Sequence, residues 1–455
     1  MSSLFTTLLN TAGAIQVFNR ALNVVQNNVA NANTPGYARQ TQTLEAASFN
    51  TATGAGGGVA AGPIQSSRDE FAEQAVRDQQ QTLGQWQQKA GDLGSITTLF
   101  SLSSTTGISS SLNNFFNSFS ELSVNPSDTA SRQAVLDSAN ALAQSFNETA
   151  QGLQSVTANV QQQTIDTVAN INQITADVAG LNQQIQGNFQ SAADPSVDTK
   201  MHTDLEQLSQ LVNFAVLKQP DGTFNLYLGG QVPLVMGNTQ FQIQANFATP
   251  QTAILDAQGN DVTAHIQQGQ LGALIDENNN IVPSYVNDLN TLAQGVADQV
   301  NNTLAGGLDQ NGSTPTINLF SYNNTTAGPA STLSVTTGMT TGQIAAASAS
   351  APGGNGNALA VAGLANAPAI NGATFTQFYG DLSARIGHDD AVANDNQTTQ
   401  QSMLTQAQNQ RQQVEGVSLD EQAAELVQFQ AAYQAAGKML SVVNQLTQTL
   451  MDIIH

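Results

Sequence analysis

The chain has 455 residues, which is too long for one hydrophobic core, so we expect about three domains. It carries 11 lysines and arginines against 33 aspartates and glutamates, a formal net charge of −22, and charged residues make up only 10% of the sequence. Nucleic acid and anionic membrane surfaces are disfavoured as partners, because both require clustered cations. Much of the polar surface must be Asn, Gln, Ser and Thr, whose burial between subunits costs less desolvation than burial of charges, and this favours close packing against other protein copies.

The amino terminus and the absence of cysteine exclude several classes of protein. With no cysteine there is no disulfide, thiolate nucleophile or cysteine-ligated metal site. The first residues, MSSLFTTLLNTAGAIQ, have neither a basic segment nor a small-residue cleavage site, and no apolar run reaches the length of a membrane span. We therefore expect no cleaved signal peptide and no membrane segment. Export by a dedicated machine that reads an uncleaved amino terminus stays open.

The first predicted element is a helix from about Leu4 to Ala32. Its apolar residues alternate at spacings of four and three, which is typical of a coiled coil, and Thr11 fills the one gap. The helix should end before Pro35, which disfavours helical geometry at the preceding residue, and Pro35-Gly36 suits the two central positions of a type II turn. The apolar positions are Leu4, Leu8, Ile15, Phe18, Leu22, Val25 and Val29.

Loops and further helices follow. Residues 41–62 are expected to be loop or extended chain, and helical spacing returns over 83–100 and 112–122. The segment NPSDTASRQ, which begins at residue 125, predicts a stop and a new start with Ser127 or Asp128 as N-cap. A regular apolar pattern then runs from Val135 to Ile185. A helix of about fifty residues would be about 75 Å long, so its order must come from packing along its length.

The character of the chain changes near residue 212. The segment FAVLKQPDGTFNLYLGGQVPLV alternates apolar and polar residues around Asp221-Gly222 and Gly229-Gly230, which predicts β-hairpins. Strands are expected to continue to about residue 266 and to form a small β-rich insert. A helix is predicted over 284–304, followed over 305–375 by loops with one strand at 333–336.

The carboxy-terminal part is helical again. One helix is predicted over 389–414, and a second begins after Gly416, where Ser418 and Glu421 have the spacing of a capping box. In this second helix apolar residues again alternate at three and four, so both ends of the chain are heptad helices of similar length. The positions are Leu426, Phe429, Tyr433, Ala436, Leu440, Val443, Thr447, Leu450 and Ile454.

These elements predict an α+β fold in three parts. The amino- and carboxy-terminal helices pair in a coiled-coil stem formed by residues 1–62 and 416–455. A second domain, a long-helix bundle with loops, is formed by 63–210 and 276–415, and 211–275 form the inserted β-rich outer domain. Two paired helices leave much of their apolar stripes uncovered, and head-to-tail contacts between copies can build rings, tubes or filaments. We therefore predict that the stem packs against neighbouring copies.

Two motifs carry a resemblance to a known family. The segment NNVANANTPGYARQ at 27–40 resembles the signature that follows the first helix of bacterial flagellar rod, hook and hook-associated axial proteins, and GVSLDEQAAELVQFQAAYQAAGKML at 416–440 resembles the matching signature at their carboxy-terminal end. SRDEF at 67–71 and NPSDTASRQAVLDSANALAQSFN at 125–147 are most similar to the hook-associated members at the hook-filament junction. The resemblance covers about 1–305 and 375–455. It implies that a corner between the stem and the next layer is formed by Asn31, Ala32, Asn33, Thr34, Pro35, Gly36 and Tyr37.

The resemblance also implies a function and partners. Copies of the chain would form the junction ring between hook and filament, with hook protein below and a second hook-associated protein and the filament above. The subunit would be secreted by flagellar type III export without signal cleavage, after a cytoplasmic chaperone has held its carboxy-terminal helix. No cofactor, metal, nucleic acid or membrane is implied. The alternatives are another axial component, such as hook or distal-rod protein, and a secreted adhesin or hydrolase within 212–375.

Catalytic and metal motifs are weak by comparison. Asp276, Asn278 and Asn280 imitate the first ligands of a calcium loop, but Ile281 replaces the glycine that such a loop needs. The group His388-Asp389-Asp390 is expected to consist of acids near a helix start, because no nucleophile motif accompanies it. The glycines at 54 and 56–58 follow no clear strand and lack a lysine, which argues against phosphate binding. We therefore predict a structural protein without catalytic activity.

Overall fold

The computed structural model describes residues 2–48, 57–100, 106–188, 191, 194–325 and 327–454. The fold is α+β as predicted, with long helices and small antiparallel sheets. The chain divides into two compact units. Unit 1 comprises Met1–Leu83, Asn170–Gln242 and Gln400–His455, and unit 2 comprises Gly84–Ala169 and Ile243–Thr399. The helices α2 (Glu70–Thr97), α4 (Thr129–Gly187) and α10 (Phe375–Glu415) contribute residues to both units.

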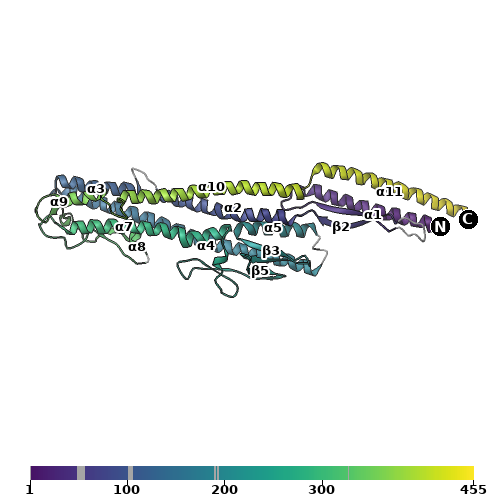
Figure 1. Ribbon diagram of the computed structural model, residues 1–455, viewed down its shortest axis with the longest axis horizontal. Coiled ribbons are helices and arrows are strands. Elements are labelled where there is room, and N and C mark those ends of the chain that lie inside the picture. The colour runs from purple at the N-terminus through teal and green to yellow at the C-terminus, as the bar shows by residue number, and fades with distance from the viewer. Residues whose placement is uncertain are drawn as a thin grey trace. The chain divides into compact units, whose positions relative to one another are not determined.

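Both chain ends belong to unit 1. Helix α1 (Ser2–Ala30) and helix α11 (Leu419–Ile454) pack side by side and antiparallel, with the two termini at the same end (Figure 1). Strands β1 (Gln40–Ala46) and β2 (Val59–Ser66) form an antiparallel hairpin in register from Gln40 opposite Ser66 to Ala46 opposite Val59. The predicted helices at both ends are confirmed, and the segment expected to be loop or extended chain contains this hairpin.

The rest of unit 1 is a small sheet with helices. Strands β3, β4, β5 and β6 form an antiparallel sheet in that order, and alternate residues of β4 are buried. Gly222, Gly229 and Gly230 have positive φ in the connecting turns, as the predicted hairpins require. The bounds are α5 (Pro195–Leu211), β3 (Phe214–Lys218), β4 (Phe224–Leu228), β5 (Val232–Met236) and β6 (Thr239–Gln240).

Unit 2 is a helical bundle with one large apolar core. The core is rich in phenylalanine, and Phe115 packs edge-on against Phe116 and Phe119. The main helices besides its parts of α2, α4 and α10 are α3 (Gly107–Val124), α6 (Gly269–Asp276), α7 (Val282–Ala305), α8 (Gly328–Thr332) and α9 (Gly356–Gly363). A π-helix (Glu277–Ile281) joins α6 to α7. The strands are β7 (Gln244–Asn246), β8 (Ala253–Leu255), β9 (Gly307–Leu308), β10 (Phe320–Ser321), β11 (Ser334–Val335) and β12 (Ala347–Ser348).

Several helix predictions are confirmed and others need correction. Helix α4 has 59 residues, and the Asp128 carboxylate before it accepts a hydrogen bond of 2.8 Å from the Ser131 backbone N–H, so Asp128 is its N-cap. The predicted helix over 284–304 corresponds to α7. The described residues of 305–375 contain short helices and four short strands besides loops, including the predicted strand as β11.

The prediction for Asp389 and Asp390 is wrong. Both residues lie inside α10, which begins at Phe375, so they are not at a helix start. Asp389 instead accepts a hydrogen bond of 2.6 Å from the Tyr285 hydroxyl. The predicted helix began too late because Gly380 and Gly387 weaken the helix propensity of its first turns, although Phe375, Tyr379 and Leu382 have helical spacing and enter the core.

Candidate assembly site at the terminal helices

The predicted apolar stripe of α1 is covered only in part. Its residues Leu4, Leu8, Ile15, Phe18 and Leu22 are half-buried, Val25 is buried and Val29 is exposed. The most buried face is rotated by about one residue from the predicted stripe and consists of Thr11, Val17, Ala21, Val24, Val25 and Asn28. This face contacts α11 and the β1–β2 hairpin. The role of the stripe in subunit packing stays a prediction.

Helix α11 is covered far less than α1. Of its predicted stripe, Ala436 and Val443 are buried, Leu426, Phe429, Leu440 and Thr447 are half-buried, and Tyr433 and Leu450 are exposed. The side chain of Ile454 lies outside the described part of the chain. The stripe therefore faces α1, because residues of α1 are the main neighbours of this helix.

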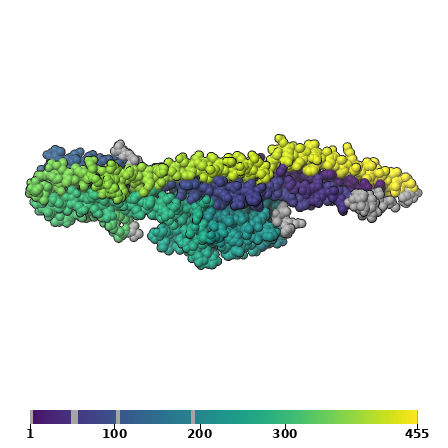
Figure 2. Space-filling view, viewed as in Figure 1, coloured from purple at the N-terminus to yellow at the C-terminus, as the bar shows by residue number. Residues whose placement is uncertain are grey.

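A second apolar stripe on α11 has no cover in the described chain. Val427, Met439, Val442, Leu446 and Ile453 are between 51% and 77% exposed. Their spacing places them on one side of the helix, turned away from the stripe that faces α1. Figure 2 shows α11 in yellow on the outside of unit 1 beside α1 in purple. Exposed apolar residues grouped in this way are typical of binding surfaces.

The predicted corner is a tight turn. The Tyr37 N–H donates to the Thr34 carbonyl over 3.2 Å, and Gly36 has a φ of +74°, as the predicted type II turn requires. Asn31 and Thr34 bond to each other through their side chains over 3.2 Å. Asn33 and Pro35 are exposed, and Ala32 is half-buried. The turn is fixed on one side by the Arg68 guanidinium, whose Nη2 donates to the Gly36 carbonyl over 2.7 Å.

A buried asparagine ties the corner to both terminal helices. Asn28, 1% exposed, donates through Nδ2 to the Gln40 carbonyl over 2.8 Å and to the Gln422 side chain over 2.9 Å. Its Oδ1 accepts from the Tyr37 hydroxyl over 2.8 Å and from the Gln40 N–H over 2.9 Å. All four bonds of one amide are satisfied, so Asn28 sets the register of α1 against α11. The sequence alone does not single it out, because Asn28 lies beside the predicted stripe in a group of asparagines.

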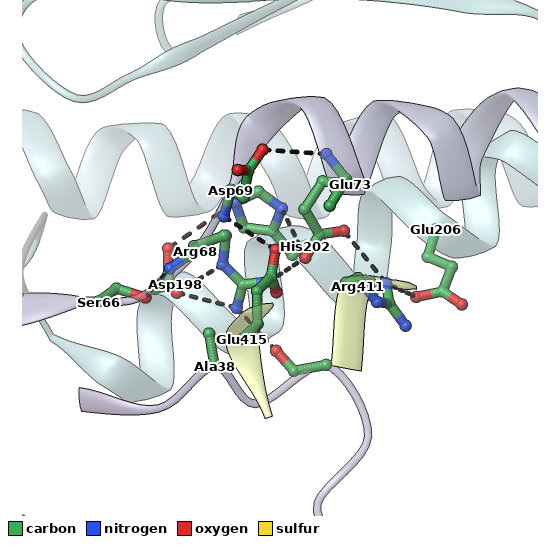
Figure 3. A network of polar contacts seen from close by, with 12 residues as sticks. Ala38, Ser66, Arg68, Asp69, Glu73, Asp198, His202, Glu206, Arg411 and Glu415 are labelled. Atoms are coloured by element: carbon green, nitrogen blue, oxygen red, sulfur yellow. Dashed lines mark hydrogen bonds and ion pairs between the residues drawn. The ribbon is translucent and has the colours of Figure 1, made fainter. Parts of the chain in front are cut away.

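The carboxy-terminal end of α10, where the chain turns into α11, is held by an ion-pair network (Figure 3). Arg68 pairs with Glu73, with Asp198 over 2.9 Å and with Glu415 over 3.6 Å, and its side chain is 5% exposed. Arg411 pairs with Glu73 over 3.1 Å and with Glu206 over 3.0 Å. We call Arg68, Glu73, Asp198, Glu206, Arg411 and Glu415 the root network.

Backbone contacts at the same place join α10 to the corner segment. The Glu415 side chain accepts from the Asp69 N–H over 2.9 Å, and its carbonyl accepts from the Arg39 N–H over 2.8 Å. Arg39 pairs with Glu421 over 2.6 Å in the first turn of α11. The predicted capping contact is present, with the Glu421 N–H donating to the Ser418 hydroxyl over 3.4 Å. The start of α11 is therefore fixed to the corner.

Burial changes the titration of two groups here. It raises the pKa of the Glu415 carboxyl to about 7, and the neighbouring Glu73 adds to this increase. Burial also holds the pKa of His202 well below its usual range, helped by the positive charges of Arg68, Arg77, Lys218 and Arg411. The two His202 ring nitrogens lie 3.8 Å from carboxylate oxygens of Glu73 and Asp198 without a hydrogen bond. His202 is therefore uncharged at neutral pH and lies between the carboxylates of Glu73 and Asp198 without pairing with either.

The residues considered for metal or catalytic roles have structural roles. Asp276 ends α6 and pairs with Lys89 over 2.7 Å, while Asn278 and Asn280 belong to the π-helix rather than to a loop. Within the described ranges no three carboxylates or imidazoles gather at a possible metal site. No described helix combines the length and apolarity that crossing a membrane needs. Of the glycines at 54 and 56–58, residues 54 and 56 lie outside the described residues, and Gly57 and Gly58 lead into β2.

The fold and the terminal site define a class of protein. Residues 8–37, which include most of α1 and the corner, match the family described as flagella basal body rod protein. A stem made from both chain ends and a helical body then define a flagellar structural protein.

The particular family follows from a longer match. Residues 93–320, half of the chain, match the family described as flagellar hook-associated protein FlgK helical domain, and the chain belongs to this family. It is thus a flagellar hook-associated structural protein, as the motifs predicted.

Similar proteins are found over the full length. The chain is 25% identical to flagellar hook-associated protein 1 of Bacillus subtilis (strain 168), with 99% of each chain covered. It is 26% identical to flagellar hook-associated protein 1 of Salmonella typhimurium, with 100% of each covered. The fold is similar to that of the flagellar hook junction protein FlgK from Burkholderia pseudomallei, with a TM-score of 0.68 and 16% identity over 76% of this chain and 100% of that one.

Proposed function

We propose that this chain forms the junction ring between the flagellar hook and filament by lateral packing of its stem against other copies. The observation that carries this proposal is the uncovered apolar stripe of α11, which runs parallel to a stripe already used against α1. Apolar residues exposed along one side of a helix are typical of a surface that another molecule covers. The similar Burkholderia protein is described as a flagellar hook junction protein, which supports this location.

The proposed partners follow from that location. Copies of the chain are the lateral neighbours, hook protein lies below the ring, and a second hook-associated protein and the filament lie above it. The subunit is secreted through flagellar export, and a cytoplasmic chaperone covers the carboxy-terminal helix α11 before export. Covering Val442 and Leu446 in this way would prevent premature association. The role is mechanical and needs no catalysis.

The three-part organisation predicted from the sequence is part of the proposal. In it, residues 1–62 and 416–455 form the assembly stem, 63–210 and 276–415 form the supporting body, and 211–275 form an outer insert. Within unit 1, the root network and Asn28 attach the stem to the helices next to it. A stem fixed at its start can pass force from a neighbouring copy to the rest of the subunit.

Val442→Asp tests stem packing. Val442 is 54% exposed in the single chain, so a carboxylate there leaves its fold intact but places a charge in the proposed contact. We expect the purified variant to unfold at the parent's temperature but to be absent from the ends of isolated hooks in electron micrographs. Asn444→Asp, an exposed change of the same charge on another side of α11, is the matched control and should cap hooks.

Normal capping of hooks by Val442→Asp would refute packing through this stripe. The rival assignment to hook or distal-rod protein rests on the shared amino-terminal match, which covers only residues 8–37. The match over 93–320 favours the hook-associated role. A chain of the rival type would be found along hooks or rods rather than at hook ends in the same micrographs.

A further inference from the structure

The outward faces of the two stem helices each follow a regular spacing. On α1 the exposed face carries two large apolar residues, Phe5 (62% exposed) and Leu9 (57% exposed), and continues at spacings of three and four towards the corner. It consists of Phe5, Leu9, Ala12, Gln16, Arg20, Asn23 and Asn27. On α11 the uncovered stripe begins at the first turn of the helix. Besides Val427, Met439, Val442, Leu446 and Ile453, the same side of the helix carries Asp420, Ala424, Ala431, Ala435, Lys438 and Thr449.

These faces carry charges that the single chain does not pair. Among the exposed lysines and arginines of the described residues, Lys200, Lys218 and Arg385 are in ion pairs, whereas Arg20 and Lys438 have no partner. In a chain with 33 acidic residues against 11 basic ones, two free cations on one stem are notable. Helix α1 contains Arg20 as its one charged residue.

The stem carries few carboxylates that a second copy could offer to Arg20. Glu45 is exposed but lies on the β1–β2 hairpin rather than on a stem helix. Glu421 is engaged by Arg39 over 2.6 Å, and Glu425 accepts from the Gln422 amide over 3.1 Å. Asp452 lies beside the uncovered stripe rather than on it. Asp420 belongs to the stripe, is exposed and has no partner among the described residues. Its ordinary role is to complement the positive end of the helix, and this role does not occupy its outward oxygen atoms.

We infer that Arg20 of one copy pairs with Asp420 of a second copy and thereby sets the axial stagger of neighbouring stems. The inference rests on the proposed stem packing and adds its register. Because Asn28 bonds to Gln422, residue 30 of α1 is level with Asp420 of the same chain. Arg20 is ten residues from that level, so neighbouring stems are displaced along their axes by about 15 Å at 1.5 Å per residue.

The same displacement matches large side chains with small ones. With Arg20 level with Asp420 of the second copy, Leu9 comes level with Ala431 and Phe5 with Ala435 of that copy, because the helices run antiparallel within each stem. Large apolar side chains of α1 then lie against alanines of α11, which is the complementarity that close helix packing needs. The α1 face has no carboxylate for Lys438, so Lys438 stays in solvent.

Charge reversal tests this pair in the full chain, expressed as the sole copy in cells that build flagella with it. Arg20→Glu and Asp420→Arg should each lower the amount of the chain in purified flagella by roughly tenfold, since like charges would face each other in a partly desolvated contact. The double variant should restore most of the loss. Gln430→Glu, which adds a negative charge to an exposed position on another side of α11, is the control and should be incorporated normally.

Cysteine cross-linking gives a second readout, because the chain has no cysteine of its own. Arg20→Cys combined with Asp420→Cys should produce a ladder of disulfide-linked dimers and larger species in oxidised flagella. Gln26→Cys with Asp420→Cys should not, since Gln26 is exposed on another side of α1. Failure of rescue together with absence of the ladder overturns the register. If Val442→Asp still blocks incorporation while the register fails, the proposed stem packing remains supported but Arg20 and Asp420 do not set its register.

Discussion

Helices α7 and α11 have similar sequence patterns and opposite surroundings. Both repeat apolar residues at spacings of three and four, yet α7 buries residues along its whole length, from Val282 to Leu304. On α11 only Gln422, Ala436 and Val443 are buried among the described side chains. The periodicity of a helix therefore predicts that it has an apolar stripe, but not whether its own chain covers that stripe. In the stem packing that we propose, a neighbouring copy covers the uncovered stripe of α11.

Hydrogen exchange of the free chain should give the largest difference between the two helices. Amides of α7 should exchange at the rate of global unfolding, and those of α11 beyond Gly437, together with the first half of α1, on the order of a thousandfold faster. The reason is that few buried contacts oppose their local opening. The measurement is mass spectrometry of the unassembled chain at micromolar concentration. Strong protection of both terminal helices there would contradict an assembly-dependent stem.

Matched leucine truncations test the same contrast in stability. Leu292 of α7 is fully buried and Leu446 of α11 is 51% exposed. Leu292→Ala should lower the free energy of unfolding of the body by about 2–5 kcal/mol, and Leu446→Ala should change it by less than about 0.5 kcal/mol. Urea titration of the two purified variants measures both. A comparable loss in Leu446→Ala would mean that the free chain already covers the outer stripe of α11.

Much of the fold follows from sequence patterns in this way. The long helix α4, the terminal helices and the hairpins of the small sheet were predicted because 3.6-residue or two-residue periodicity extended over many residues. The start of α10 and the many short strands of 305–375 were missed. Elements of two residues have no periodicity, and glycines interrupt the helical pattern at the start of α10.

The site was predicted less completely than the fold. The turn at Pro35-Gly36 has a local chemical signature, so it was found. The hub Asn28, its partner Gln422 and the root network join residues far apart in the chain, up to 394 positions, and their chemistry becomes visible only when the fold brings them together. The outer stripe of α11 was hidden because the adjacent inner stripe had the more regular leucines.

Unlike α7, which its own core holds in place, α11 is held mainly at its start, where Glu415 lies in the root network. Because the pKa of Glu415 rises from 4.5 in the unfolded chain to about 7 in the folded one, its stabilising contribution is present below pH 4.5 and is lost as the pH rises to 7. Above that pH the carboxylate is buried beside Glu73. Glu415→Gln removes this pH-dependent contribution to stability, and its side-chain oxygen can still accept the hydrogen bond from the Asp69 N–H.

The expected result is a change in relative stability with pH. Relative to the parent, Glu415→Gln should gain on the order of 2 kcal/mol between pH 4.5 and pH 8, since each unit of pKa shift corresponds to about 1.4 kcal/mol. His202, whose lowered pKa acts in the opposite direction by destabilising the fold as the pH falls below 6.5, is present in both proteins and cancels. Urea unfolding at the two pH values measures the difference. If the difference in free energy of unfolding between variant and parent were the same at both pH values, Glu415 would be ionised over the whole range.

A substitution at Gly36 in the corner should have the smallest effect on stability. It distinguishes two reasons for glycine there, the left-handed backbone and the close contact with Thr203. Gly36 has a φ of +74°, and a Cβ there would lie 2.6 Å from the Thr203 hydroxyl of α5. Gly36→Ala should therefore lower the free energy of unfolding of the stem attachment by about 1–2 kcal/mol, mainly through the left-handed backbone. Thr203→Ala removes the clash but not the backbone cost, so the double variant should recover only part of the loss in urea titration. Full recovery would show that contact with α5, and not the turn, demands glycine. The corner would then be a packing site, and α11 would depend on the root network and Asn28 alone for its direction.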